Sequence, residues 1–92
     1  MDIKILPLPA ETLKQKVKDE TKLGFGKLFT DRMLLAEWKS DQGWCDARIQ
    51  PYAPFELDPS CMVFHYAQEI FEGLKAYRWA DGRVALFRPE MN

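Results

Sequence analysis

The chain has 92 residues, 47% hydrophobic and 29% charged, which is the composition of a globular protein rather than of a disordered one. Thirteen basic and fourteen acidic residues give a net charge of -1, which excludes a strongly basic surface for nucleic acid. No apolar run approaches the roughly 20 residues of a membrane span, and two cysteines with one histidine are too few ligands for a zinc site. We expect one small domain at most, in a reduced, cytoplasmic setting without a disulfide.

The first 22 residues are expected to form an N-terminal extension. Residues 1–9 are apolar but interrupted by Pro7 and Pro9, which favours an extended segment and leaves no signal-peptide apolar region. Pro9 suits the first position of a helix, and residues 10–22 are rich in helix formers. A short helix is therefore expected over residues 10–22, although its apolar stripe is thin and needs packing for support.

The next segment carries the signals of a loop followed by a β-hairpin. Gly24 and Gly26 predict a loop over residues 23–27, and no strand and helix surround them as a phosphate-binding loop would require. The apolar run in residues 30–38 predicts a strand, followed by turn residues at 40–43. Residues 44–49 are expected to pair back as the second strand of the hairpin.

Prolines dominate the section after this hairpin. Pro51, Pro54 and Pro59 predict an extended connector, because proline removes a hydrogen-bond donor and biases the preceding residue toward extended geometry. Asp58 is expected to cap a short helical turn with Pro59 in its first position, completed by residues 61–66.

The last section predicts a second hairpin. A strand is expected near Phe71, Asp81-Gly82 is a tight-turn signal, and a returning strand over residues 84–87 should end before Pro89. The elements together predict an α+β fold of mostly antiparallel strands with short helices.

Two groups of polar residues allow a catalytic interpretation and a structural one. His65 beside Tyr66 could act as an acid–base pair, but no nucleophile or third orienting group accompanies them, so a hydrogen-bonded structural histidine is favoured. Glu69 and Glu72 could form a carboxylate pair, but solvated surface positions are favoured, since on a strand they would point to opposite faces. The aromatic side chains nearby either fill a core or line an apolar pocket, and composition alone favours a core.

A series of short motifs runs through residues 23–92 in one order. They are Phe25-Gly26, Phe29-Thr30-Asp31-Arg32-Met33, Gly43-Trp44, Arg48-Ile49, Pro51-Tyr52, Leu57-Asp58-Pro59, His65-Tyr66, Phe71-Glu72-Gly73-Leu74-Lys75-Ala76-Tyr77 and Leu86-Phe87-Arg88-Pro89. Their order and spacing closely resemble the early part of the branched-chain amino acid aminotransferases, which use pyridoxal 5′-phosphate (PLP). Two positions depart from that pattern: Arg32 stands where the family usually has histidine, and Ala67 where glycine is common.

The resemblance implies a class IV, D-amino-acid-aminotransferase-like fold, of which residues 23–92 would form an incomplete small domain. Enzymes of this family are homodimers that exchange an amino group between leucine, isoleucine or valine and 2-oxoglutarate. By resemblance, Tyr66 and Phe71 line the pocket for the branched side chain, and Gly73 leaves room beside the substrate. Aromatic walls of this kind would accept all three similar substrates, because one methylene changes binding only slightly.

The resemblance also implies that the catalytic lysine is outside these residues. The family's Schiff-base lysine lies far downstream, and its phosphate-binding arginine would be the third residue after Asn92. Lys75 and Arg88 do not match either position, so no catalytic or cofactor-binding residue is assigned within the chain. We expect a fragment that is inactive alone and binds PLP only as part of the full-length enzyme. The alternative is a non-catalytic binding or association module derived from that fold.

Overall fold

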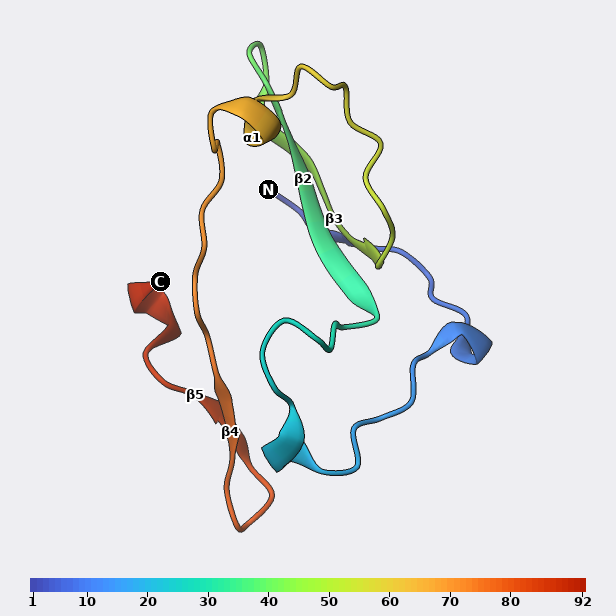
Figure 1. The fold of residues 1–92 in the computed structure, drawn as a ribbon, viewed down its shortest axis with the longest axis vertical. Coiled ribbons are helices and arrows are strands. Elements are labelled where there is room, and N and C mark those ends of the chain that lie inside the picture. Colours follow the sequence, from blue (N-terminus) through green and yellow to red (C-terminus); the bar gives the residue numbers. More distant parts are fainter. The chain divides into compact units, whose positions relative to one another are not determined.

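The computed structural model describes all 92 residues, which form two compact units, Met1–Phe55 and Glu56–Asn92. The first unit contains a three-stranded sheet in the order β1-β3-β2, and the second a two-stranded sheet, β4-β5 (Figure 1). Mixed strands and a few short helices agree with the predicted α+β class. In chain order the elements are β1 (Lys4–Ile5), η1 (Ala10–Thr12), η2 (Glu20–Lys22), β2 (Arg32–Lys39), β3 (Gly43–Pro51), α1 (Met62–His65), β4 (Ala76–Arg78), β5 (Val84–Leu86) and η3 (Pro89–Met91).

The predicted hairpin of the first unit is confirmed. β2 and β3 pair antiparallel from Arg32 opposite Pro51 to Lys39 opposite Gly43, and the ends of both strands lie close to the predicted ones. The turn is closed by the backbone N–H of Gln42, which donates to the Lys39 carbonyl at 3.2 Å. Gly43 has φ +69°, a conformation that glycine adopts without steric cost.

A β-bulge interrupts this hairpin. The register shifts between Leu35 and Glu37, which pair with Arg48 and Cys45, so two residues of β3 lie opposite one of β2. One of the two is Asp46, whose φ of +49° is left-handed. Beside it, Ala47 is buried, at 3% exposure.

A charged cluster surrounds the bulge. The guanidinium of Arg48, which is half-buried, donates from Nη1 to Asp46 Oδ2 at 2.6 Å and to Glu37 Oε1 at 3.3 Å. Its Nε donates to Gln50 Oε1 at 2.9 Å. Because one planar side chain joins both strands and the bulged residue, it favours this register over a slipped one.

The predicted helix over residues 10–22 is wrong. Only the two 3-10 turns η1 and η2 form there, and the backbone becomes extended at Leu13, with ψ 134°. Pro9 precedes the first turn rather than occupying its first position, and its carbonyl accepts the N–H of Thr12. The thin apolar stripe explains the outcome, because a short helix without a buried face is not stable.

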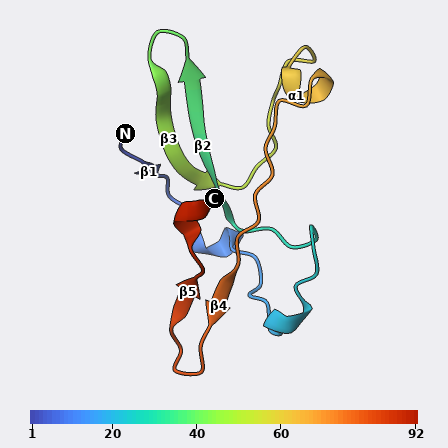
Figure 2. The same ribbon diagram turned by 90° about the vertical axis from the view of Figure 1, so that its left-hand side faces the viewer.

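Contacts with the sheet hold this extension in place. β1 pairs parallel with β3, on the opposite side of β3 from β2 (Figure 2). Further along, Lys14 donates from its backbone N–H to Asp31 Oδ1 at 2.9 Å, and from Nζ to the carbonyls of Phe29 and Thr30 at 3.1 and 2.9 Å. The same ammonium lies 4.7 Å from the ring centroid of Tyr52. Tertiary contacts therefore determine the backbone here, rather than helix propensity.

Pro51 ends β3, and residues 52–58 of the predicted connector have no regular structure and lead into a turn after Asp58. Asp58 Oδ1 accepts from the backbone N–H and the hydroxyl of Ser60, at 2.8 and 2.6 Å. The helix α1, however, begins only at Met62, with Cys61 as its N-cap and no side-chain cap. The prediction that Asp58 caps this helix is therefore wrong: it caps the turn that precedes it.

The hairpin predicted around Asp81-Gly82 is confirmed, with Ala76 opposite Leu86 and Arg78 opposite Val84. Gly82 has φ +86°, as a tight turn requires. A strand near Phe71 does not form, because the pairing of β4 with β5 begins only at Ala76, and residues 67–75 lie outside this sheet. None of the chain's helices combines the length and the apolar character needed to cross a membrane.

Candidate functional site

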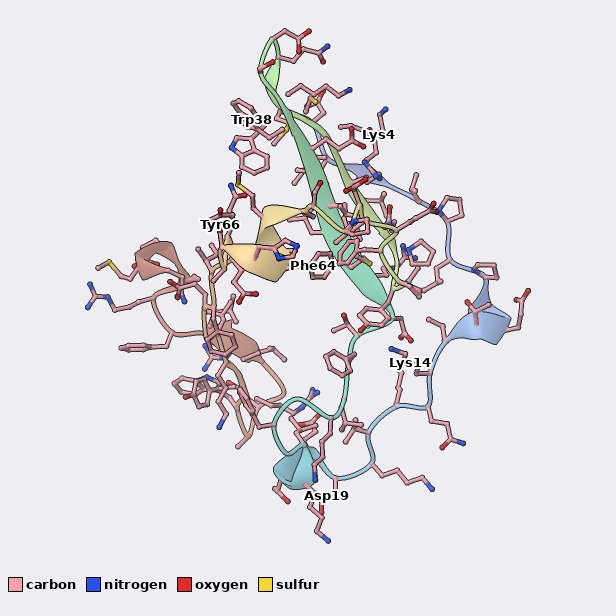
Figure 3. All side chains as sticks on the ribbon, turned by 45° about the horizontal axis from the view of Figure 1, so that its top comes forward. Lys4, Lys14, Asp19, Trp38, Phe64 and Tyr66 are labelled. Carbon is pink, nitrogen blue, oxygen red and sulfur yellow. The ribbon has the colours of Figure 1, made fainter.

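The three predicted site residues lie in the segment between α1 and β4. Tyr66 ends α1 and donates its backbone N–H to the Met62 carbonyl at 2.8 Å, and its side chain is seen beside the helix in Figure 3. Phe71 and Gly73 follow in residues 67–75, which belong to no helix or strand. The sequence order therefore places all three in one connecting segment of the second unit.

The aromatic residues of this segment are strongly exposed. Tyr66 and Phe71 are each 80% exposed, and Ile70 is 93% exposed. No residue of Glu56–Asn92 is buried. The two rings are therefore not sealed in a finished core.

Gly73 has an open side. An added Cβ would meet no heavy atom within 4 Å, and φ at this glycine is not in the left-handed region. Neither the backbone conformation nor packing within the chain therefore requires glycine here. Gly73 also lines an open depression of about 410 Å³, together with Leu74, Lys75, Tyr77, Phe87, Arg88, Met91 and Asn92.

Ala67 is one of the two departures from the family pattern. The backbone conformation at this position explains why glycine is common there. Its φ is +47°, in the left-handed region where glycine is free and alanine costs about 1–2 kcal/mol. The methyl group at this position therefore strains the backbone between Tyr66 and the segment that follows. The other departure, Arg32, donates from Nη1 to the Leu6 carbonyl at 2.7 Å and so ties β2 to the N-terminal extension.

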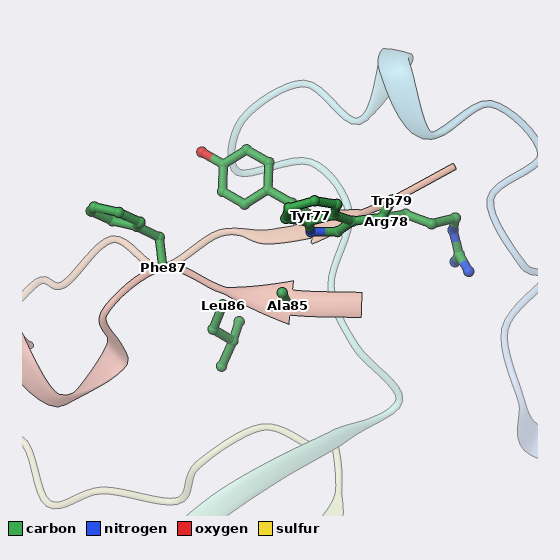
Figure 4. Close-up of a pocket in the computed structure, with 6 residues that line it drawn as sticks. All are labelled: Tyr77, Arg78, Trp79, Ala85, Leu86 and Phe87. Atoms are coloured by element: carbon green, nitrogen blue, oxygen red, sulfur yellow. The ribbon is translucent and has the colours of Figure 1, made fainter. Parts of the chain in front are cut away.

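A second depression lies on the β4–β5 hairpin, and sequence reasoning did not identify it. It measures about 420 Å³ and is lined by Tyr77, Arg78, Trp79, Ala85, Leu86 and Phe87. Tyr77, Trp79 and Phe87 rise from one side of the hairpin, and Leu86 projects from the other (Figure 4). The available signal was the period-two spacing of Tyr77 and Trp79 before Asp81-Gly82, with Phe87 after it.

The polar candidates are engaged locally. His65 Nε2 lies 2.7 Å from the Pro59 carbonyl, which agrees with the structural interpretation of this histidine. Glu72 Oε2 accepts a hydrogen bond from Asn92 Nδ2 at 2.9 Å. The partner of Glu72 is therefore an amide, and not the Glu69 carboxylate of the pair considered from the sequence. Lys75 Nζ lies 5.3 Å from the ring centroid of Tyr77.

The charge state of two aspartates is shifted by hydrogen bonds outside the candidate segment. The Ser60 hydroxyl and backbone N–H lower the pKa of Asp58, and Thr21 lowers the pKa of Asp19 in the same way. Both are exposed residues at turns, so these hydrogen bonds stabilise the turns and do not mark a catalytic site. No group of three or more histidine, cysteine, aspartate or glutamate side chains could hold a metal ion, and Cys45 and Cys61 are free thiols.

Comparison with known proteins gives a consistent result, although no family model matches the chain. It is 62% identical over 69 residues to a probable branched-chain-amino-acid aminotransferase of Streptomyces coelicolor, and 58% identical over 74 residues to branched-chain-amino-acid transaminase 1 of Bacillus subtilis. These matches cover 75% and 80% of the chain but 19% and 21% of the relatives.

The cytosolic branched-chain-amino-acid aminotransferase of Saccharomyces cerevisiae is 48% identical over 95 aligned positions, which cover 96% of the chain and 25% of that relative. The chain thus spans about a fifth to a quarter of the length of the curated relatives it matches. By its sequence, the chain belongs to the branched-chain-amino-acid aminotransferase family and corresponds to the N-terminal part of its members.

Proposed function

We propose that these residues act within a PLP-dependent aminotransferase that exchanges an amino group between leucine, isoleucine or valine and 2-oxoglutarate. The observation that carries the proposal is 58–62% identity to relatives named for branched-chain-amino-acid amino transfer. The proposed enzyme is a cytoplasmic homodimer of the class IV fold. Residues 1–22 form its N-terminal extension, and residues 23–92 part of its small domain.

In this enzyme, Tyr66 and Phe71 form one wall of the pocket for the branched side chain. Their exposure supports this role, since apolar rings left uncovered by their own unit are suited to contact a ligand or another part of the protein. Gly73 supports it too, because the open space at its missing side chain has no explanation within the chain. The wall would bind the aliphatic side chain and exclude water from it, while the polar end of the substrate points to the cofactor.

We assign no complete PLP site to the side chains of this chain alone. PLP serves as an electron sink and needs a covalent lysine and a partner for its ring nitrogen. Lys75 lies over the Tyr77 ring, and no carboxylate lines the depression into which Lys75 and Arg88 open. We therefore assign the chain a share in substrate binding, and leave the covalent lysine and the phosphate-binding arginine to the rest of the enzyme.

A chimeric enzyme tests the proposed function. The matching N-terminal segment of the Bacillus subtilis transaminase is replaced by the residues of this chain, and amino transfer from leucine, isoleucine and valine to 2-oxoglutarate is measured. We expect the chimera to bind PLP and to use all three substrates. Phe71→Ala in the chimera should raise KM for leucine about tenfold, as expected for the loss of a well-packed aromatic contact. A chimera that binds PLP and transfers amino groups only from other amino acids would refute the proposal.

The 92-residue chain alone gives a separate result. After incubation with PLP and dialysis, we expect no visible absorbance to remain and borohydride to attach no cofactor to Lys75. A stable product on Lys75 would contradict the assignment of the covalent lysine elsewhere.

The second candidate function is a non-catalytic association module, and the exposure of the apolar side chains in Glu56–Asn92 is the observation that favours it. An active chimera would decide for the enzyme. A chain that forms a defined complex by itself, together with an inactive chimera, would decide for the module.

A further inference from the structure

We propose that Asn92 is a positioning residue, which holds the backbone of Gly73 at the place where the branched substrate approaches. This inference rests on the proposed function, because it takes Tyr66, Phe71 and Gly73 as the substrate wall. Asn92 itself is assigned no contact with substrate or cofactor. It acts through the segment that it anchors.

The carboxamide of Asn92 makes two hydrogen bonds to neighbouring residues of this segment. Its Nδ2 donates to Glu72 Oε2 at 2.9 Å and to the backbone carbonyl of Gly73 at 3.1 Å. A primary amide carries two N–H donors on one nitrogen, so both acceptors can be satisfied at once. The bond to the Glu72 carboxylate is charge-assisted and therefore stronger than an ordinary amide hydrogen bond.

The fold brings Asn92 to this position by a sharp reversal after β5. Arg88 has a left-handed backbone, with φ +43°, and Pro89 then starts the 3-10 turn η3. The backbone N–H of Asn92 donates to the Pro89 carbonyl at 3.3 Å, which closes the turn. In Figure 1 this C-terminal turn lies beside the segment that leads into β4. The left-handed backbone of Arg88 is strained for a non-glycine residue, and this conformation directs η3 back toward Gly73.

The segment needs an anchor because it belongs to no regular element. Residues 67–75 lie outside the helices and strands, and one backbone bond within them is local, from Glu69 N–H to the Ala67 carbonyl at 2.8 Å. Asn92 provides hydrogen bonds that span 19 and 20 positions of the sequence. Long-range bonds of this kind fix the backbone where sheet pairing is absent.

The position of the Gly73 backbone determines how closely a substrate can approach this part of the wall. With no side chain of its own and nothing within 4 Å of a Cβ, the closest approach of a ligand is set by its backbone. Asn92 also lines the depression that Gly73 borders. If the carbonyl of Gly73 is released, this part of the wall becomes mobile. Discrimination between valine and the two larger substrates, which carry one more methylene, and between the branching patterns of leucine and isoleucine is then lost first.

The experiment uses the chimeric enzyme and four single variants. Asn92→Ala removes both donors, Asn92→Asp also opposes the Glu72 charge, and Glu72→Gln keeps an acceptor for the Asn92 amide. Glu90→Ala in η3 is the matched control, since Glu90 is exposed and takes part in none of these hydrogen bonds. KM and kcat are measured for leucine, isoleucine and valine, with PLP absorbance as the measure of folding.

We expect Asn92→Ala to lower kcat/KM for leucine about tenfold, with the change in KM rather than in kcat. The kcat/KM values for leucine, isoleucine and valine should also become more similar to one another. Asn92→Asp should lower kcat/KM for leucine further than Asn92→Ala does. The double variant Asn92→Asp with Glu72→Gln should recover part of that loss, because the new amide at position 72 can donate to the new carboxylate at position 92. Glu90→Ala alone should remain within about twofold of the parent. Glu72→Gln, which keeps an acceptor but loses the charge, should fall between the parent and Asn92→Ala.

Several results would overturn the inference. One is an Asn92→Ala enzyme with the parent's KM values for all three substrates; another is a loss in kcat alone without rescue by the double variant. An independent readout is protease cleavage of the chimera, in which Asn92→Ala should speed cutting within residues 67–75 but not within β2. A chimera inactive with native Asn92 would count against the proposed function instead, and an unchanged cleavage rate would then still refute the anchoring role.

Discussion

At the scale of single residues, Asp58 shows how short hydrogen bonds to a carboxylate change its pKa. The Ser60 hydroxyl, at 2.6 Å, and then the Ser60 backbone N–H lower the pKa of this carboxyl below its ordinary value of about 3.9. Since the pKa is lower in the folded chain than in the unfolded one, the stabilising effect is present above the unfolded pKa. It is lost as the pH falls through the folded pKa.

Ser60→Ala tests this account. The variant removes the larger cause and keeps the backbone N–H, so the pKa of Asp58 should rise part of the way toward its ordinary value. Carboxyl chemical shifts followed from about pH 2 to about pH 6, on either side of the ordinary aspartate pKa, measure the change. Asp19, whose pKa is lowered by Thr21, is the internal control and should not respond. An unchanged Asp58 titration would show that the hydroxyl does not cause the shift.

Single residues also show how far the sequence signals reach. The neighbours of His65 in the sequence favoured a structural role, and the hydrogen bond to Pro59 agrees with it. The same kind of reasoning gave Asn92 no role, because its partners Glu72 and Gly73 lie 20 and 19 positions away. A hydrogen bond over that distance has no local sequence signature.

At the scale of elements, the β2–β3 hairpin was predictable and its bulge was not. Apolar runs on either side of Ser40-Asp41-Gln42-Gly43 predict the pairing, and the structure confirms it. The bulge depends on Asp46 at φ +49° and on the contact between Asp46 and Arg48 within β3. Aspartate tolerates the left-handed region better than most residues, but nothing near it in the sequence demands that conformation.

Substitution of Asp46 separates the backbone from the charge. Asp46→Gly and Asp46→Val both remove the carboxylate, but only valine, which is β-branched, resists a left-handed φ. We expect the chimera with valine to lose its structure at a lower urea concentration than the chimera with glycine, since the left-handed backbone costs a non-glycine residue about 1–2 kcal/mol. Trp44→Gly and Trp44→Val, at an exposed strand position of the same hairpin, form the control pair, in which glycine should be the less stable. Equal stability of the two Asp46 variants would mean that the bulge relaxes without cost.

The helix expected over residues 10–22 shows the opposite case. Local propensity favoured it, but Lys14 forms hydrogen bonds with Asp31, Phe29 and Thr30, and lies over the ring of Tyr52. A short helix gains little free energy by itself, so these contacts outweigh it. Interactions with residues 15 or more positions away therefore decided this segment.

At the scale of the whole molecule, the two units bury very little apolar surface. Ala47 is the buried hydrophobic residue, and large side chains such as Phe25, Ile70 and Phe71 are 80–93% exposed. Burial of apolar surface is the main stabilising contribution in folding, so a chain with this much uncovered surface should bind its own copies or another polypeptide.

We expect the purified 92-residue chain to elute as associated species in size-exclusion chromatography and to unfold without a sharp transition. Ile70→Asp should reduce the association, because Ile70 is 93% exposed and a charge there opposes apolar contact. Glu69→Asp, at the neighbouring position, keeps its charge and serves as the control. A monomer with a cooperative unfolding transition would show that the chain is a self-sufficient domain.

The sequence by itself determined the local turns, the two hairpins and membership of the branched-chain-amino-acid aminotransferase family. Each of these depends on residues close together in the chain or on the order of motifs along it. Only the tertiary structure decided that residues 10–22 are not a helix, that Asp46 forms a bulge and that Asn92 reaches Gly73. These features depend on contacts between residues distant in the sequence, or on how two strands meet, and their energies are not encoded in any short stretch of it.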